Sequence, residues 1–295
     1  PAGGPWRRPA KNAPFRWPAG FMGLDALFEF HREGVQSNRD AAAIDPDREV
    51  LLQRLRDFAA GRPAPEISDA AKPSEASKPC HGRGLGAVPP AILERASGHY
   101  DPALARRRVR DALASDPNAS FVRELAYRPG DTRWFVAIAP LCHRPRHALL
   151  QAMDHSDGAL LSVRKDRGNK PYTHFGWATF APDNCFLSAR SSCRTRAFPT
   201  RTPDGSENLT AAGHDWFASA EQGLLYALAV LASETYRTRF EWLLRQDHPR
   251  LPEPRDLAAV VEAGVVEAAV VEAAVVTEPH VVEAGVVTEP HAVEA

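Results

Sequence analysis

The chain has 295 residues, a length that suits one large domain or two modest ones. Its apolar share of 44% is ordinary for a globular protein, and 26 prolines indicate many turns and linkers. The last 40 residues hold eight acidic residues and no lysine or arginine, so the first 255 hold 36 basic against 29 acidic residues. Such a basic body is suited to polyanions, and it permits both nucleotide phosphates and nucleic acid as partners.

Three further observations limit the setting of the protein. No run of 18 apolar residues occurs, so we expect no contact with a membrane. The four cysteines lack the spacing of a disulfide framework, which favours free thiols in a reducing compartment and a cytoplasmic, intracellular location. Cys142-His143, followed by His147 and His155, matches no standard ligand spacing. We therefore expect no metal site, and no motif implies a cofactor.

The first 88 residues predict an arm, short helices and a linker. Residues 1–20 are rich in proline, arginine and tryptophan, which favours an extended basic arm that contacts phosphate or a partner. Within residues 21–88, a short amphipathic helix is expected over 21–30. A second helix is expected from Asp45-Pro46 to Gly61, before a Pro/Gly/Ser-rich linker.

Residues 89–258 are expected to form the main α+β domain. Asp101-Pro102 predicts a helix start, and the basic run 106–110 that follows is either a solvated face or an anion contact. Alternating apolar residues predict two hairpins and then a polar loop over 199–208. The strands of these hairpins are expected over 121–127 with 134–138 and over 159–163 with 172–180.

The clearest helix is predicted between residues 217 and 242. Ser219 suits the N-cap, and Gln222 follows three residues later, as in a capping box. Glu221 lies within about 40° of the direction of Leu225 and Leu228 on a helical wheel. Its carboxylate therefore either complements the helix dipole at the solvent edge or is directed into a ligand cleft.

Residues 259–295 repeat Val-Val-Glu-Ala units. A five-residue period advances about 140° per unit on a helix and changes faces on a strand, so neither structure gains a steady apolar face. We expect a low-complexity tail, or else a segment that a large assembly holds in place.

A family resemblance begins at about residue 170 and extends to about 260. It rests on His174-Phe175-Gly176-Trp177, on Cys185-Phe186-Leu187-Ser188, and on the segment from Trp216 to Gln222. Together these resemble the first half of the NADAR family, the YbiA-like proteins associated with NAD and ADP-ribose. Ala189-Arg190 departs from the family pattern, and the late Trp-Gly-x-Gly segment has no counterpart. The expected architecture is therefore a helical N-terminal portion, a mixed central region, a NADAR-like helical module and the tail.

The resemblance implies a module that binds ADP-ribose-type nucleotides and, if active, is a hydrolase of the N-glycosidase class. Glu221 would be the catalytic carboxylate that stabilises an oxocarbenium-like state. The aromatic residues would stack on a ring of the ligand, and Arg190, Arg194 or Arg196 would pair with a pyrophosphate. The implied ligand-binding residues are Trp177, Phe186, Ser188, Arg190, Trp216 and Gln222.

Blander interpretations of the same residues stay open. The aromatic residues are equally consistent with a hydrophobic core, and the arginines with a solvated loop. The half-length motif set, the basic arm, the repeat tail and the start at Pro1 also fit another function. The alternative is a catalytically inactive NADAR-like structural protein, such as a surface or accessory component of a virus particle or other large assembly.

Overall fold

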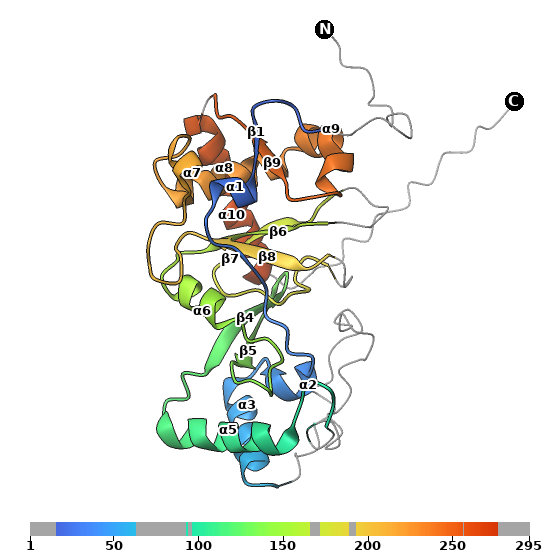
Figure 1. Cartoon of the computed structure of the whole chain (residues 1–295), viewed down its shortest axis with the longest axis vertical. Coiled ribbons are helices and arrows are strands. Elements are labelled where there is room, and N and C mark those ends of the chain that lie inside the picture. Colours follow the sequence, from blue (N-terminus) through green and yellow to red (C-terminus); the bar gives the residue numbers. More distant parts are fainter. Residues whose placement is uncertain are drawn as a thin grey trace, which may run out of the picture.

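The computed structural model describes residues 16–62, 93, 96–165, 172–188, 193–255 and 257–276. They form an elongated body in which antiparallel sheets are stacked along the long axis, with helices at both ends (Figure 1). The expectation of a mixed fold of helices and strands is thereby confirmed. The helices are α1 (Leu24–Leu27), α2 (Asp40–Ala43), α3 (Arg48–Ala59), α5 (Pro102–Ser115), α6 (His147–Asp154), α7 (Ala211–His214), α8 (Ala220–Ala232), α9 (Glu234–Leu244) and α10 (Leu257–Val276). The strands are β1 (Phe21–Gly23), β2 (Arg32–Glu33), β3 (Ile44–Asp45), β4 (Val122–Arg128), β5 (Asp131–Val136), β6 (Ala159–Val163), β7 (Phe175–Ala178), β8 (Thr195–Pro199) and β9 (Arg250–Pro252).

Three sheets connect distant parts of the chain. The largest has the order β2-β8-β6-β7, the second has the order β3-β5-β4, and β1 pairs with β9. Both predicted hairpins are present, as antiparallel β4-β5 and β6-β7. Because β1, β2 and β3 each pair with a much later strand, the N-terminal segment forms an edge of every sheet.

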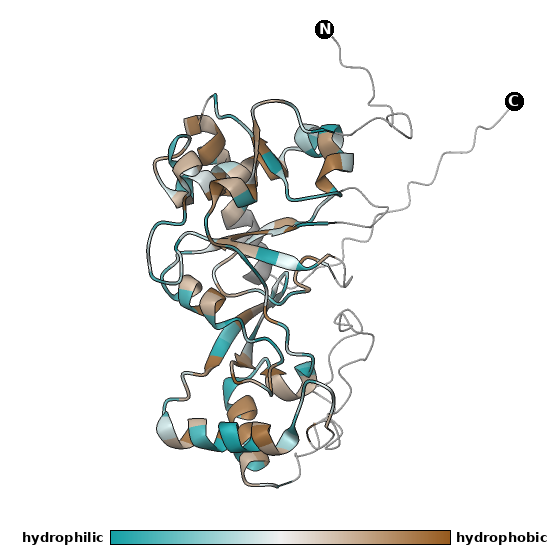
Figure 2. Ribbon diagram, in the orientation of Figure 1, coloured by the Kyte–Doolittle hydropathy of each residue, from teal (hydrophilic) through white to brown (hydrophobic). Residues whose placement is uncertain are grey.

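The two larger sheets separate hydrophobic cores. On β6, Leu160 belongs to the core under α8 and α9, whereas Leu161 belongs to the core between the two larger sheets. This alternation follows from the two-residue period of a strand, and it buries β6 at every position. A third core joins α3 to α5 through residues such as Leu51, Leu55 and Val109. Hydrophilic and hydrophobic residues alternate along α5 (Figure 2), whose Ala105 and Val109 are buried while other positions are exposed.

Helix caps follow the predicted residues with small shifts. Asp101 caps α5 as expected, and its carboxylate accepts hydrogen bonds from the amides of Ala103 and Leu104. The cap of α3 is Asp47 rather than Asp45. Only β1 and the short α1 occupy the segment that predicted a helix over 21–30. Local propensity predicted a helix from residue 21 onward. The first three residues of that segment instead form β1, because they pair with β9.

Three arginines of the basic run on α5 contact the protein's own main chain. Arg106 and Arg110 donate to the carbonyl oxygens of Phe58 and Ala59 at the end of α3, at 3.0 and 2.9 Å. Arg108 donates to the carbonyl of Ala139 at 2.9 Å. These side chains therefore satisfy carbonyls at the C-terminus of α3 and attach α5 to its neighbours.

The long helix predicted over 217–242 is two helices. Ser233 has extended backbone angles between α8 and α9, and its hydroxyl accepts a hydrogen bond from the amide of Tyr236. Ser219 caps α8 as expected, while the Gln222 side chain accepts from Ala218 rather than from Ser219. A serine in the middle of a helical pattern thus acted as a second N-cap, because its hydroxyl competes for backbone amides.

The first part of the repeat is helical and packed, although its five-residue period gives it no steady apolar face. Helix α10 contacts α8 and β7, and Leu257, Val260 and Val261 pack on the core there. A methyl group at Gly264 would lie 2.1 Å from the carbonyl oxygen of Leu225. The small residues of the repeat therefore allow a close backbone contact that needs no continuous stripe of large side chains. Residues 277–295 lie outside the described residues, and the domain boundaries stay predictions.

The expectations of free thiols and of no membrane contact can be compared with the cysteines and helices of the structure. Cys142 and Cys193 are buried and are not in a disulfide, whereas Cys185 is in one, so the expectation of free thiols is wrong at Cys185. Within the described part of the chain, no helix combines the length and apolarity that crossing a bilayer needs.

His248 gives the fold a pH-dependent stability. It is buried beside His31 and Phe198, and burial lowers its pKa to about 4; Asp25, Arg196, His31 and Asp247 have smaller effects. The unfolded state binds a proton at a higher pH than the folded state, so stability is full above the unfolded pKa of about 6.5 and falls as the pH drops toward 4.

We expect the free energy of unfolding to fall by about 2 kcal/mol between pH 7.5 and pH 5. His248→Gln should remove most of this difference in urea denaturation, whereas His214→Gln, at an exposed position on α7, should preserve it. Parallel pH profiles of the wild type and His248→Gln would contradict the assignment.

Candidate functional site

The structure does not bring the predicted ADP-ribose residues into one pocket. Glu221 is exposed in the first turn of α8, the solvent-edge alternative of the sequence analysis. Trp177 is buried in the core under α8, whereas Phe186 is buried in the core between the sheets. Trp216 packs half-buried against the first of these cores. The aromatic side chains therefore fill cores, which was the blander interpretation.

The remaining predicted residues have local roles or cannot be placed. Gln222 caps the amide of Ala218 at 2.9 Å, and Ser188 is half-buried after Leu187. Arg190 lies outside the described residues. That any of these side chains contacts a ligand stays a prediction.

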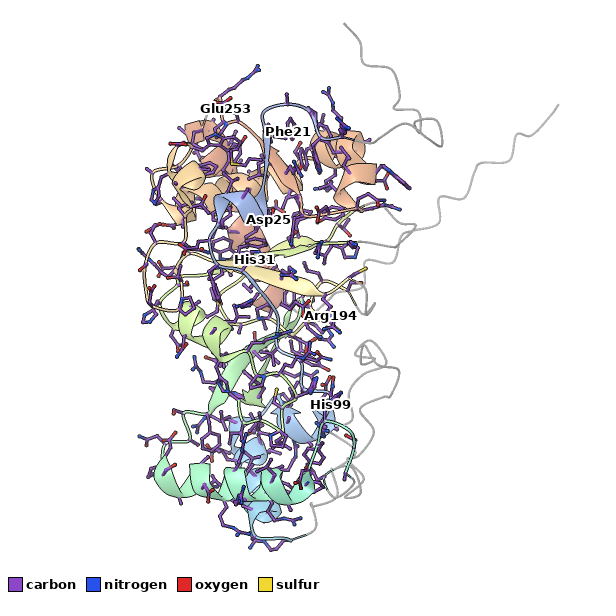
Figure 3. The ribbon with its side chains drawn as sticks, viewed as in Figure 1. Phe21, Asp25, His31, His99, Arg194 and Glu253 are labelled. Atoms are coloured by element: carbon purple, nitrogen blue, oxygen red, sulfur yellow. The ribbon has the colours of Figure 1, made fainter. Side chains whose placement is uncertain are left out.

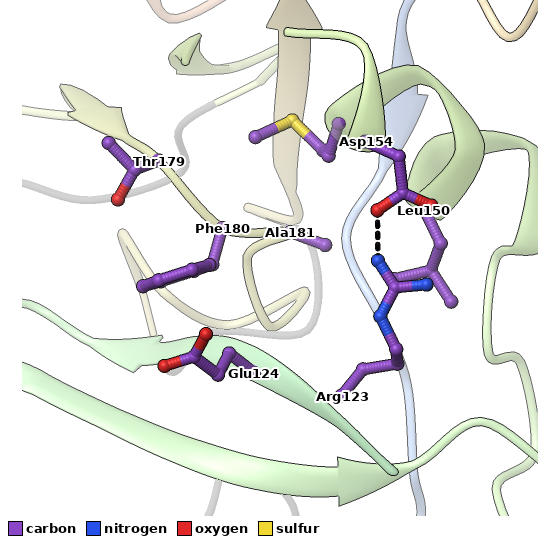
Figure 4. Close-up of a pocket in the computed structure, with 8 residues that line it drawn as sticks. Arg123, Glu124, Leu150, Asp154, Thr179, Phe180 and Ala181 are labelled. Carbon is purple, nitrogen blue, oxygen red and sulfur yellow. Dashed lines mark hydrogen bonds and ion pairs between the residues drawn. The ribbon is translucent and has the colours of Figure 1, made fainter. Parts of the chain in front are cut away.

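Two cavities among the described residues are candidate ligand sites. One, of 240 Å³, lies between β4 and α6, where an ion pair between Arg123 and Asp154 crosses one side (Figure 4). It is smaller than the pockets that usually hold drug-sized ligands. The other, of 520 Å³, is an open hollow between the Glu29-Phe30 segment and the loop from Thr202 to Ser206. Neither is lined by a predicted site residue, and their acidic side chains do not suit a nucleotide phosphate.

A pair of loops beside α2 has a more distinctive geometry. Gln36 and Arg144 exchange both main-chain hydrogen bonds, at 3.1 and 2.9 Å, in an antiparallel bridge. His143 extends this pairing by donating its amide to the carbonyl of Ser37. Asn38 and Arg146, one in each loop, have positive φ angles of 58° and 60°. Such backbone strain in non-glycine residues is found preferentially at functional sites.

Cationic side chains from several elements converge on these loops. Besides burial, the positive neighbours Arg144, His99, Arg39 and Arg146 lower the pKa of His143. Burial likewise lowers the pKa of Arg146, with Arg144 and Arg194 adding to the decrease against the opposing effect of Glu33. The contribution of the positive neighbours to each lowered pKa indicates that these side chains lie close together.

The cluster continues onto the largest sheet. Burial, Arg164 and Arg32 lower the pKa of Arg196 on β8, while Glu33 opposes them. We call the whole set the basic stripe, which is composed of Arg32, Arg39, His99, His143, Arg144, Arg146, Arg164, Arg194 and Arg196. His31, Arg194 and His99 succeed one another along the long axis of the molecule, in the direction the stripe takes (Figure 3).

Glu33 organises the middle of the basic stripe. Its carboxylate accepts from Arg146 at 2.7 Å and from Arg194 at 3.3 Å, and it lies 3.6 Å from Arg196. One carboxylate thus holds three guanidinium groups, which leaves two uncompensated positive charges among these four side chains. The surplus can attract an anion while the ion pairs fix the geometry of the arginines.

Imidazole side chains accompany the arginines. Arg196 donates to Nδ1 of His31 at 3.1 Å, and burial lowers the pKa of His31. The rings of His99 and His143 lie 5.0 Å apart at 34°. Arg39 lies over the ring of Tyr100 at 3.8 Å. These contacts hold the side chains at the edge of the basic stripe in fixed positions.

Fold and site together define a module of stacked antiparallel sheets that presents an elongated, preorganised array of cations. The chain belongs to the family described as the Type ISP C-terminal specificity domain, which matches residues 26–272. No curated protein matches the chain.

Three solved structures share the fold. In the cryo-EM structure of a DrdV–DNA complex, the match has a TM-score of 0.54 and 18% identity, and it covers 82% of this chain and 23% of that one. A nuclease-deletion mutant of the Type ISP restriction-modification enzyme LlaGI, in complex with a DNA substrate mimic, matches with a TM-score of 0.53, 14% identity and coverage of 83% and 19%. The ATP-dependent Type ISP enzyme LlaBIII bound to DNA matches with a TM-score of 0.55, 12% identity and coverage of 83% and 16%. The chain therefore spans about a fifth of the length of these proteins.

This membership corrects the NADAR assignment and the functions drawn from it. The family match covers nearly the whole of the described body, whereas the NADAR resemblance rested on short segments over about residues 170–260. Those segments encode a β-strand of core aromatics and a serine-capped helix start, which many folds share. ADP-ribose binding, N-glycosidase activity and the role in a virus particle are overturned with the assignment.

The sequence analysis missed most of the basic stripe. It named Arg194 and Arg196 as anion contacts, but for a pyrophosphate, and it treated Cys142-His143 only as a rejected metal motif. Among the described residues, no group of three or more histidine, cysteine, aspartate or glutamate side chains is placed to hold a metal ion. The excess of basic residues in the body was evident from the sequence, but no local pattern shows that the fold brings together segments about 160 residues apart.

Proposed function

We propose that this chain is a DNA-recognition module that binds double-stranded DNA along the basic stripe. The proposal is supported chiefly by the convergence of arginines from β2, β8 and the paired loops on one elongated surface. Duplex DNA carries a regular array of phosphates, and arginine pairs with phosphate through two parallel hydrogen bonds. Two further facts support it: the family is described as a specificity domain, and the matched structures are described as DNA complexes.

The stripe also has the division of roles that sequence recognition needs. Arg32 and Arg164 are exposed, and each belongs to the sheet end of the stripe, where they suit phosphate contacts. The paired loops carry exposed polar side chains, among them Asn38 and Arg144. Phosphate contacts fix the register of a protein on a duplex, whereas contacts with base edges carry the specificity.

We expect Arg32→Ala and Arg164→Ala each to weaken binding to a random-sequence duplex and to reduce the slope of log K against log salt by about one. The reason is that each arginine neutralises about one phosphate and releases its condensed counterion. Fluorescence anisotropy titrations between about 50 and 200 mM salt measure both quantities.

Arg56→Ala is the matched control. Arg56 is exposed on α3, so its substitution removes the same charge at a position outside the stripe. It should leave the slope unchanged. Equal slopes for all four proteins would place the DNA elsewhere, and a wild type without affinity for duplex DNA at low salt would contradict the proposed function itself.

A further inference from the structure

Asn38 presents an amide that is held in place at the surface of the basic stripe. Its Oδ1 accepts a hydrogen bond from Nε2 of Gln36 at 2.8 Å, and Oε1 of Gln36 in turn accepts from Arg194 at 3.5 Å. Gln36 is buried, whereas Asn38 is exposed. The amide therefore has a fixed orientation while its Nδ2 donors and one Oδ1 lone pair face outward.

Arg144 projects from the opposite strand of the same bridge. Its main chain is fixed by the two hydrogen bonds with Gln36, and its side chain is exposed. Within the described part of the chain, its guanidinium has no hydrogen-bond partner, unlike Arg146 and Arg194, which are bound to Glu33. Arg144 thus offers a whole guanidinium fork on a rigid two-stranded base.

Asn38 and Arg144 are the groups that read base edges most specifically. In the major groove, an asparagine amide pairs with N6 and N7 of adenine, and an arginine fork pairs with O6 and N7 of guanine. The bridge between Gln36 and Arg144 fixes the main chain from which both groups project. The surrounding arginines of the stripe would meanwhile neutralise the flanking phosphates.

We propose that Asn38 and Arg144 are the base-reading residues of this chain, Asn38 for an adenine and Arg144 for a guanine near it. The inference rests on the proposed DNA-binding function and adds the base classes and the residues that select them. Gln36 is a positioning residue in this scheme, because it orients the Asn38 amide without itself reaching the surface.

The test is selection of duplexes from a random pool by the full chain, followed by sequencing of the bound fraction. The wild type should enrich a motif that contains an adenine and a guanine. Asn38→Gly should lose the preference for the adenine by about 10- to 100-fold and keep the guanine. Glycine is chosen because it accepts the positive φ at this position, so the amide is removed without strain.

Arg144→Lys should lose the preference for the guanine while its salt slope stays unchanged, because lysine keeps the charge but lacks the fork. Arg32→Ala serves as the opposite control, since it should weaken binding to all sequences equally. In the selected duplex, replacing the adenine by 7-deazaadenine should weaken binding of the wild type about tenfold and leave Asn38→Gly unaffected.

The outcomes separate the two levels of the proposal. A wild type that binds no duplex overturns the proposed function. Binding with a base preference that survives both Asn38→Gly and Arg144→Lys, or binding with no preference at all, overturns the base-reading assignment and leaves DNA binding in place.

Discussion

Gly34→Ala is expected to lower the free energy of unfolding by about 3 kcal/mol and to weaken DNA binding in the protein that remains folded. A methyl group at residue 34 would lie 2.4 Å from the carbonyl oxygen of Pro182 and 2.7 Å from the main-chain carbon of Asp183. Both neighbours are main chain, so no flexible side chain can move to relieve the contact.

The position of Gly34 explains why both properties should change. The amide of Gly34 donates to Thr195, and the next residue, Val35, exchanges main-chain hydrogen bonds with Pro182 and Asn184. Displacement of the Gly34–Val35 segment would move Gln36 and Asn38 relative to Arg194, which precedes β8. Loss of alignment within the basic stripe should therefore accompany the loss of stability.

Gly98→Ala is the matched control, because a methyl group there would meet no atom within 4 Å. Guanidinium denaturation measures the stability of both variants, and the anisotropy titration measures their affinity. Equal stability of Gly34→Ala and Gly98→Ala would contradict this prediction. It would show that the main chain at Gly34 can move away from Pro182 and Asp183 without loss of stability.

Arg128→Met is expected to cost about 3 to 5 kcal/mol in stability at neutral pH, because it leaves the Asp183 carboxylate buried without its counter-charge. Arg128 donates to Asp183 at 2.8 Å, and the Asp183 side chain is only 4% exposed. Burial raises the pKa of Asp183 against the opposing effect of Arg128, and Asp40 raises it further. Asp183 also accepts from the amide of Cys185, so the loss extends to the loop that follows it.

The pH dependence of this loss identifies its cause. Without Arg128, the pKa of Asp183 should rise further, so that the carboxyl group becomes protonated and neutral at a higher pH. The difference in stability between the wild type and Arg128→Met should therefore be larger at pH 8 than at pH 5.5.

Arg123→Met provides the surface comparison. Arg123 pairs with Asp154, which is 47% exposed, and such ion pairs contribute about 0 to 1 kcal/mol. Equal losses from Arg123→Met and Arg128→Met, or a loss at Arg128 that does not vary with pH, would contradict the account of a buried charge.

Local signals in the sequence predicted most elements with a short-range cause. Asp101 and Ser219 begin their helices because each carries a side-chain acceptor beside free amides, and the two hairpins follow from alternation around a turn. The edge strands β1, β2 and β3 were missed because they are two or three residues long. Their pairing partners lie elsewhere in the chain, so no local pattern marks them.

The site was harder to predict for a related reason. The basic stripe joins Glu33 to Arg194, and Gln36 to Arg144, across separations that only the folded chain closes. Glu221 shows a second limit of local patterns. Its wheel position allowed either a buried or a solvent-edge carboxylate; in the structure Ala220 and Gly223 are the buried residues of this turn, and Glu221 is exposed. Periodicity gives the direction of a side chain and not how far the neighbouring layer extends.

The contact between Gly264 and Leu225 bears on how this chain can vary in length. Tandem five-residue units are prone to gain or lose copies during replication. Loss of the unit 260–264 would put the alanine that ends the next unit at the place of Gly264, and its methyl group would meet the carbonyl oxygen of Leu225. A duplicated copy of the same unit would keep a glycine there. Units added beyond Val276 leave the contact where it is. Loss of copies is thus constrained at one glycine, whereas gain of copies is tolerated.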